Sequence, residues 1–224
     1  MDPVTKAEAE SIERRIVEVE SRTGVQVVAA VVPRADSYPE LPWRAFALGA
    51  SLSGLVALAI DIGRPDWLSA QALLMQTLAI LSGGTLAGVL AMQLPSFAKL
   101  FLGARRAKAE VRQCAESMFL SRELFATPRR DAVLILVSQF EHRVVIVPDV
   151  YCRGRVTASE WETVVAMMTP KLREGRTADA FAAGLGEMEA LFTGKGFAPA
   201  EDALAKRGAP GNTLPDSLVR GEGS

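Results

Sequence analysis

The chain has 224 residues, of which 49% are hydrophobic, and its 25 Lys and Arg residues against 26 Asp and Glu leave a formal net charge of −1. This length is sufficient for one or two domains with a buried core. The near-neutral charge argues against a nucleic-acid-binding protein, which needs a basic excess or a basic face. The composition also excludes a disordered or collagen-like chain.

The N-terminal segment predicts a helix followed by a buried strand. Thr5 and Glu8 have the spacing of a capping box, and the apolar stripe behind them consists of Ile12, Ile16 and Val19. Gly24 stands where a helix C-cap glycine belongs. Residues 25–32 are apolar enough for a strand that is buried on both faces, and Pro33 ends it.

Residues 45–98 carry only three charges, Asp61, Arg64 and Asp66, and these separate two apolar runs. The first run, residues 45–60, would span about 24 Å as a helix, somewhat less than a hydrocarbon core of about 30 Å. Residues 42–44, Pro-Trp-Arg, extend this run toward a membrane interface. The second run, residues 67–98, is long enough to cross. Neither run has a polar face, so a transmembrane hairpin is predicted rather than a buried soluble one.

Small residues in both runs predict close helix packing, with Gly84 and Gly88 spaced as in a small-xxx-small motif. Packing within one hairpin is the favoured interpretation, and a homodimer through the same face is the alternative. Basic residues follow the second run, against the single acidic Glu110: Lys99, Arg105, Arg106, Lys108 and Arg112. The positive-inside rule therefore predicts a multi-pass membrane protein with both termini in the cytoplasm. A reducing compartment would leave Cys114 and Cys152 as thiols.

The second half of the chain alternates helices and strands. Helices are predicted over residues 108–120, 157–173 and from Thr177 onward, where the second helix starts with the capping box Thr157-x-x-Glu160. Residues 132–137 and 144–147 predict an antiparallel strand pair. Because a lone strand is not stable, the strand at 25–32 is expected to join this pair.

The predicted fold class is therefore α/β, a single sheet-and-helix domain interrupted by a two-helix transmembrane hairpin. The expected boundaries are 1–42 for the first helix and strand, 43–98 for the hairpin (spans at about 43–60 and 68–94), 99–196 for the rest of the domain and 197–224 for a loosely ordered tail.

Several short motifs resemble the TPM domain family of phosphatase-like proteins, and in particular its small proteobacterial membrane proteins. The matching residues are Phe119, Thr127-x-x-Arg130 leading into 133–137, Val145-Ile-Val-Pro-Asp149, Trp161 with Val164 and Val165, Gly175-Arg176, Gly184 and Asn212-Thr-Leu-Pro-Asp216. The likeness spans residues 25–216. Asp131-Ala132 and Tyr151-Cys152 depart from the family pattern, which puts the start of that strand and the loop beside Asp149 in doubt.

No nucleophile elbow, phosphate-binding loop or His/Cys metal site is present in the sequence. Asp149 follows a strand, where α/β folds collect ligands, and Asp216 lies in a loop that could fold back to it. Together they could hold Ca²⁺ or Mg²⁺, with Arg130 as partner for an anion or a carboxylate. The alternative interpretation makes Asp149 a loop cap and Arg130 a solvated charge. Cys152 lies near Arg153 and Arg155, which predicts a lowered thiol pKa.

Three candidate functions follow. The favoured one is a non-catalytic interaction or accessory module, tethered to the lipid bilayer, whose partner is another membrane or envelope protein. The alternative, which the resemblance implies, is a weak phosphatase dependent on a divalent metal and using Asp149 and Asp216. A structural subunit that dimerises through Gly84 and Gly88 is a third option. No nucleic acid and no organic cofactor are expected.

Overall fold

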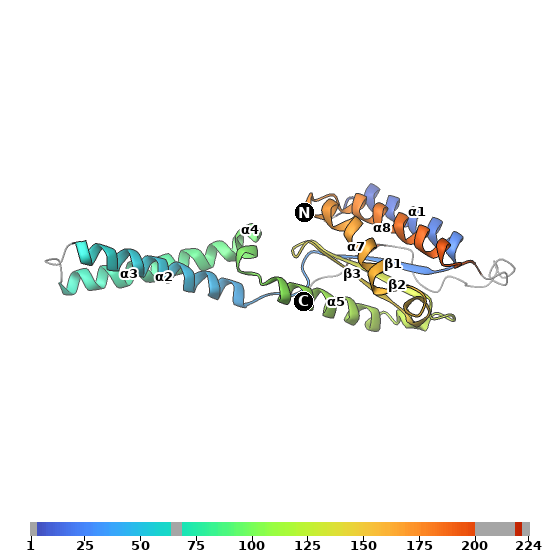
Figure 1. The fold of residues 1–224 in the computed structure, drawn as a ribbon. Helices are drawn as coiled ribbons and strands as arrows, with labels where there is room; N and C mark the ends of the chain where they lie inside the picture. The colour runs from blue at the N-terminus through green and yellow to red at the C-terminus, as the bar shows by residue number, and fades with distance from the viewer. Residues whose placement is uncertain (1–3, 64–68, 200–217, 221–224) are drawn as a thin grey trace. The chain divides into compact units, whose positions relative to one another are not determined.

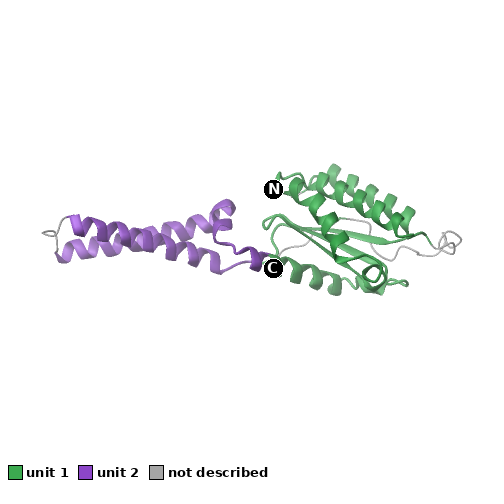
Figure 2. Ribbon diagram, in the orientation of Figure 1, with its two compact units in different colours: residues 1–36, 108–224 green, residues 37–107 purple. Residues whose placement is uncertain are grey.

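The computed structural model describes residues 4–63, 69–199 and 218–220. The chain divides into two compact units, one from residues 1–36 and 108–224 and the other from residues 37–107 (Figure 2). The predicted mixed α/β domain with a helical hairpin inserted into its sequence is confirmed.

The first unit contains a sheet and the helices that cover it (Figure 1). Its helices are α1 (Lys6–Thr23), most of α5 (Ala104–Ser121), the 3₁₀ turn η3 (Leu124–Ala126), the single turn α6 (Val150–Arg153), α7 (Ala158–Arg173) and α8 (Thr177–Gly194). Its strands are β1 (Gln26–Val32), β2 (Ala132–Ser138), β3 (Arg143–Pro148) and the short β4 (Val219–Arg220).

The sheet has the strand order β3-β2-β1-β4. β1 pairs in parallel with β2, with Gln26 opposite Ala132, and β2 pairs antiparallel with β3, with Val133 opposite Pro148. The prediction that the first strand joins the later pair is therefore confirmed. β4, which the sequence did not predict, pairs in parallel with β1 at Ala30 and Val31. β3 thus forms one edge of the sheet in the described part of the chain.

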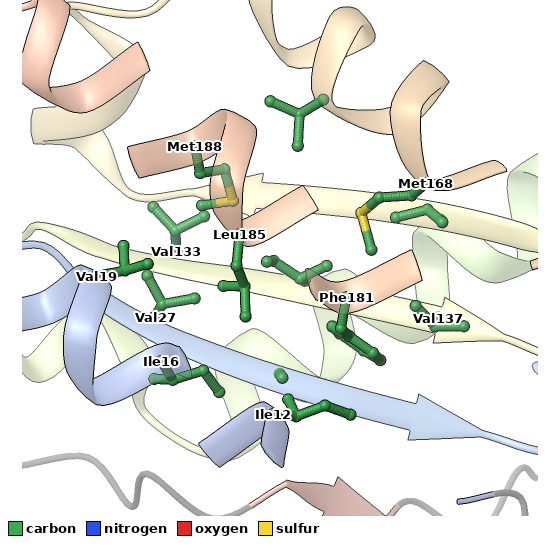
Figure 3. Close-up of a cluster of buried hydrophobic side chains, with 14 of the residues drawn as sticks. Ile12, Ile16, Val19, Val27, Val133, Val137, Met168, Phe181, Leu185 and Met188 are labelled. Carbon is green, nitrogen blue, oxygen red and sulfur yellow. The ribbon is translucent and has the colours of Figure 1, made fainter. Parts of the chain in front are cut away.

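Apolar side chains cover both faces of the sheet, which explains why β1 and β2 have no polar face. One core joins β1 and β2 to α1, α7 and α8, with Phe181 and Leu185 fully buried in it (Figure 3). A second core joins the opposite face to α5 through Val111, Ala115 and Phe119. Each face buries hydrocarbon that would otherwise contact water, and this burial is the main favourable contribution to the fold.

Predicted helix ends are confirmed at both capping boxes. The Glu8 carboxylate accepts the Thr5 backbone N–H at 2.8 Å, and the Thr157 N–H donates to Glu160 over the same distance. Gly24 ends α1 with φ +69°. That left-handed conformation is readily available to glycine because it has no Cβ.

The second unit consists of a helical hairpin and a short C-terminal segment. It contains α2 (Glu40–Gly63), α3 (Ala70–Gln93), the single turn α4 (Pro95–Ala98) and the 3₁₀ turn η2 (Lys99–Phe101). Both long helices are long and apolar enough to cross a membrane, with mean hydropathies of 1.9 and 1.7. Of the most apolar 18-residue stretch of each helix, only 6% in α2 and 11% in α3 is buried inside the protein, so these are not core helices of the described fold.

Glycines allow α2 and α3 to pack closely. A Cβ at Gly49 would lie 2.6 Å from the Gly83 carbonyl oxygen, and one at Gly84 would lie 2.8 Å from the Phe46 ring. Gly88 lies against the backbone of Pro42, 3.4 Å from its carbonyl oxygen by the same measure. Gly84 and Gly88 therefore make contacts within the hairpin, as the favoured interpretation of the sequence expects.

Candidate functional site

The candidate site lies where the start of β2 meets the end of β3. The antiparallel register brings residues 130–132 beside residues 149–151, although 19 positions separate Arg130 from Asp149. Two backbone hydrogen bonds join the segments, from the Asp149 N–H to Ala132 O at 2.9 Å and from the Tyr151 N–H to Arg130 O at 3.1 Å. The sheet therefore fixes the distance between the two predicted site residues.

Arg130 and Asp149 form a bidentate ion pair. Arg130 Nε donates to Asp149 Oδ2 at 2.8 Å, and Nη2 donates to Oδ1 at 3.0 Å. The Asp149 side chain is 4% exposed, whereas that of Arg130 is 51% exposed. Asp149 Oδ1 also accepts the Val150 N–H at 2.7 Å and so caps α6. The Asp149 carboxylate thus pairs with Arg130 and also caps α6.

Arg130 holds a left-handed backbone conformation, with φ +56°. This conformation is unusual for a residue with a Cβ. The guanidinium lies 5.7 Å from the centre of the Phe125 ring, in a cation–π contact. Hydrogen bonding to Asp149 raises the pKa of Arg130 further above its ordinary value. The arginine is therefore held from two sides, by a carboxylate and by an aromatic face.

Asp131 is the second carboxylate of the site, at the position where the sequence departs from the family pattern. It is 3% exposed, and its Oδ2 lies 3.5 Å from Arg129 Nε. Its backbone N–H donates to Thr127 Oγ1 at 3.2 Å. Burial raises the pKa of Asp131, and Arg129 opposes that rise. The backbone bond to Thr127 closes the turn before β2 and so keeps the strand start ordered despite the departure.

Aromatic and basic side chains surround α6, a feature that the sequence reasoning missed. The Tyr151 ring lies 4.5 Å from the Arg155 guanidinium and 5.3 Å from that of Arg129, whose Nη2 donates to the Tyr151 hydroxyl at 3.2 Å. Phe197 stands edge-on to Tyr151, with ring centroids 5.5 Å apart. In the sequence, the available sign of this cluster was that Tyr151 lies between Arg129 and Arg155.

The expectation for Cys152 was wrong. Cys152 lies on the buried side of α6, and burial, assisted by Asp131 and Asp149, raises the pKa of its thiol to about 12. Its Sγ lies 3.6 Å from Asp131 O. Arg155 does lower the thiol pKa, but desolvation outweighs it because the thiolate would stand in an apolar core.

The carboxylates of the site do not form a metal centre among the described residues. Among residues 4–63, 69–199 and 218–220, no group of three or more His, Cys, Asp or Glu side chains is arranged to hold a metal ion. Asp149 directs its oxygens to Arg130 and Val150, and Asp131 faces Arg129. Ca²⁺ needs six to eight oxygen ligands, so this donor set does not fit it. Asp216 and the motif at 212–216 lie outside the described residues.

A groove of about 1370 Å³ adjoins the ion pair. Its floor is the outer edge of β3 with Arg130 and Asp149, and its walls are residues of α5 and α7. This volume exceeds the range of about 300–1,000 Å³ that small-molecule pockets usually occupy. The groove therefore has room for a polymer segment.

Comparisons with known proteins support the family resemblance and the fold. Residues 102–191, which include Arg130 and Asp149, match the family model of the TPM domain. The fold is similar to the NMR structure of the BA42 protein from the psychrophilic bacterium Bizionia argentinensis, with a TM-score of 0.56 and 13% identity, over 97% of this chain and 95% of BA42. No curated protein matches the chain. The predicted family resemblance is confirmed, and its proteobacterial branch stays a prediction.

Proposed function

We propose that this protein, which carries a TPM domain at residues 102–191, is a non-catalytic interaction module tethered to the bacterial inner membrane. The observation that carries the proposal is the internal pairing of the site's charges. The Asp149 carboxylate accepts hydrogen bonds from Arg130 and from the Val150 N–H, and Asp131 forms an ion pair with Arg129. An ion pair of this kind fixes the geometry of a loop, whereas a metal-dependent hydrolase needs carboxylates directed at an ion.

The hairpin supports the tether. α2 and α3 present apolar side chains over most of their surface, as shown by Leu55 at 62% and Leu86 at 62% exposed. Lipid would cover such helices, whereas water would not tolerate them. The basic residues after the hairpin favour an orientation with both termini in the cytoplasm.

A divalent-metal-dependent phosphatase is the second candidate. It is favoured by the position of Asp149, a buried carboxylate that lines the large groove directly after a strand. The name of the family model, TPM phosphatase, points in the same direction. In this alternative, Asp149 and Asp216 would bind Ca²⁺ or Mg²⁺ after Asp149 had left Arg130.

A phosphatase assay separates the two candidates. The full chain, purified in mild detergent, is incubated with p-nitrophenyl phosphate alone, with Mg²⁺ and with Ca²⁺, beside Asp149→Asn. Asp179→Asn is the matched control, because Asp179 also accepts from an arginine, Arg176, at 3.1 Å, but lies on α8 away from the groove. We expect hydrolysis at the protein-free rate in every sample. Metal-dependent hydrolysis that Asp149→Asn abolishes and Asp179→Asn preserves would refute the module.

The tether and its orientation are tested separately. The untagged chain should remain in the membrane fraction after washing with carbonate at high pH. An alkaline phosphatase reporter fused after Asp61 should be active, since this enzyme needs the periplasm, and the same reporter after Ser224 should be inactive. The reverse pattern would overturn the orientation, and a chain released by carbonate would overturn the tether.

A further inference from the structure

β3 lies at the end of the strand order, and among the described residues no strand pairs with its outer side. An open strand edge presents backbone N–H and C=O groups that can pair with another chain. Natural proteins usually block such edges with charges, prolines or a covering helix.

The register identifies which backbone groups face outward. The Asp149 N–H donates to Ala132 O, so Val147 with Leu134 and Val145 with Leu136 are the hydrogen-bonded pairs further along the ladder. Val144 and Ile146 lie in the intervening non-hydrogen-bonded pairs, and their N–H and C=O groups point away from β2. Pro148, which has no N–H, ends this row, and its carbonyl accepts from Arg153 at 3.2 Å.

The groove is lined by the residues of this edge, among which Val144 is buried and Ile146 is half-buried, and its walls add apolar contact surface. Leu120 at the end of α5 is 63% exposed and Val150 of α6 is 61% exposed, and both line the groove. Trp161 and Val165 of α7 line the opposite side. A segment that enters the groove would therefore meet backbone partners at the floor and hydrocarbon at the walls.

The charged side chains that line the groove indicate which kind of segment it would bind. The groove is lined by five basic and three acidic side chains, an excess of two positive charges: Lys108, Arg112, Arg130, Arg143 and Arg153 against Glu116, Asp149 and Glu162. A second copy of this chain would bring two such basic grooves together, and like charges oppose each other at an interface. A segment with acidic residues would instead be attracted.

We infer that the β3 edge binds an extended acidic segment of a partner protein, which adds to the sheet as a further strand beside β3. Backbone hydrogen bonds to Val144 and Ile146 provide the binding energy common to any sequence, and the basic rim selects acidic flanks. This inference rests on the proposed function, because it assigns the binding surface of the interaction module.

The test uses a defined probe. A fluorescein-labelled peptide, Asp-Asp-Val-Thr-Val-Thr-Val-Asp-Asp, is titrated with the full chain in mild detergent and followed by fluorescence anisotropy. We expect saturable binding that weakens with salt. The same peptide with Lys for Asp should bind at least about tenfold more weakly, as should a version N-methylated at alternate residues. No binding, or binding unchanged by N-methylation, would overturn the inference.

Two variants at one position isolate the backbone contact. Ile146→Pro removes an N–H that points away from the ladder, a place where sheet edges tolerate proline. Ile146→Ala keeps the N–H and removes most of the side chain. We expect Ile146→Ala to bind the acidic peptide like the parent chain and Ile146→Pro to bind about tenfold more weakly. Far-UV circular dichroism checks that both fold, and equal binding by the two folded variants would refute a backbone contact at β3.

Failure of this inference is distinguishable from failure of the proposed function. Lys108→Glu with Arg153→Glu reverses two charges of the basic rim, and Arg153→Glu also removes the hydrogen bond to the Pro148 carbonyl; the pair should weaken acidic-peptide binding while strengthening binding of the Lys peptide. The phosphatase assay on the same preparation reports independently on catalysis. The chain could show no phosphatase activity and remain in the membrane fraction, yet bind neither peptide in any variant. That result would leave the proposed function standing and would refute the β3 edge as the binding surface.

Discussion

Replacing Gly184 with alanine should destabilise the domain, although alanine is the better helix former. Gly184 lies on the buried face of α8, where an added Cβ would lie 2.7 Å from Met168 Cγ on α7 and still closer to its Sδ. Met168 is fully buried and has little room to move. This contact gives a physical reason for the glycine that the family resemblance singles out.

The magnitude follows from two opposing effects. Gly→Ala within a helix stabilises by about 1 kcal/mol, whereas overpacking a core costs about 1–3 kcal/mol. We therefore expect Gly184→Ala to lower the free energy of unfolding by roughly 1 kcal/mol. In a Met168→Ala background the clash disappears, so the same change should stabilise by up to about 1 kcal/mol.

Urea denaturation of the full chain in mild detergent, followed by near-UV circular dichroism, measures these differences. Gly186→Ala is the matched control on the same helix, because its Cβ would meet only Arg15 Nη2 at 3.9 Å. It should stabilise the parent chain. If Gly184→Ala stabilises the parent as much as Gly186→Ala does, close packing of α7 on α8 is not the role of this glycine.

Three further predictions concern other parts of the chain. Burial raises the pKa of Asp131 above its ordinary value of 3.8, so the folded state retains a proton that the unfolded chain releases. The free energy of unfolding should therefore fall as the pH rises from 3.8 through the raised pKa. Asp131→Asn should remove that fall in urea titrations carried out at a series of pH values. Maleimide at pH 8 should label Cys152 only after unfolding, and rapid labelling would contradict its burial. Gly84→Leu should lower the melting temperature in detergent by steric conflict with Phe46, whereas Gly63→Ala, with open space around it, should not.

Elements with strong local patterns were predictable from the sequence. The capping boxes at Thr5 and Thr157, the C-cap at Gly24 and the uninterrupted apolar runs of β1 and β2 each depend on neighbours within a few residues. The pairing of β1 with β2 followed from a general requirement, because an isolated strand has no partner for its backbone groups.

Other features depend on contacts that local patterns do not encode. The ion pair of Arg130 with Asp149 depends on the register of β2 on β3 and on a left-handed backbone at Arg130. α6 is a single turn, too short for a helical pattern in the sequence, so the burial of its residue Cys152 could not be predicted. β4 has two residues and follows a segment rich in glycine and proline, which hid its pairing with β1.

The parallel pairing of β1 with β2 has a consequence for the order of folding during synthesis. Gln26 meets Ala132 only after more than a hundred further residues have been made, and the two candidate membrane helices lie between them. Within the hairpin unit, Arg44 near the start of α2 donates to Phe101 O at 3.0 Å, so the chain returns close to its point of departure. A hairpin formed first would shorten the effective loop and lower the entropy cost of closing the sheet. Formation of the hairpin would then precede, and accelerate, completion of the domain.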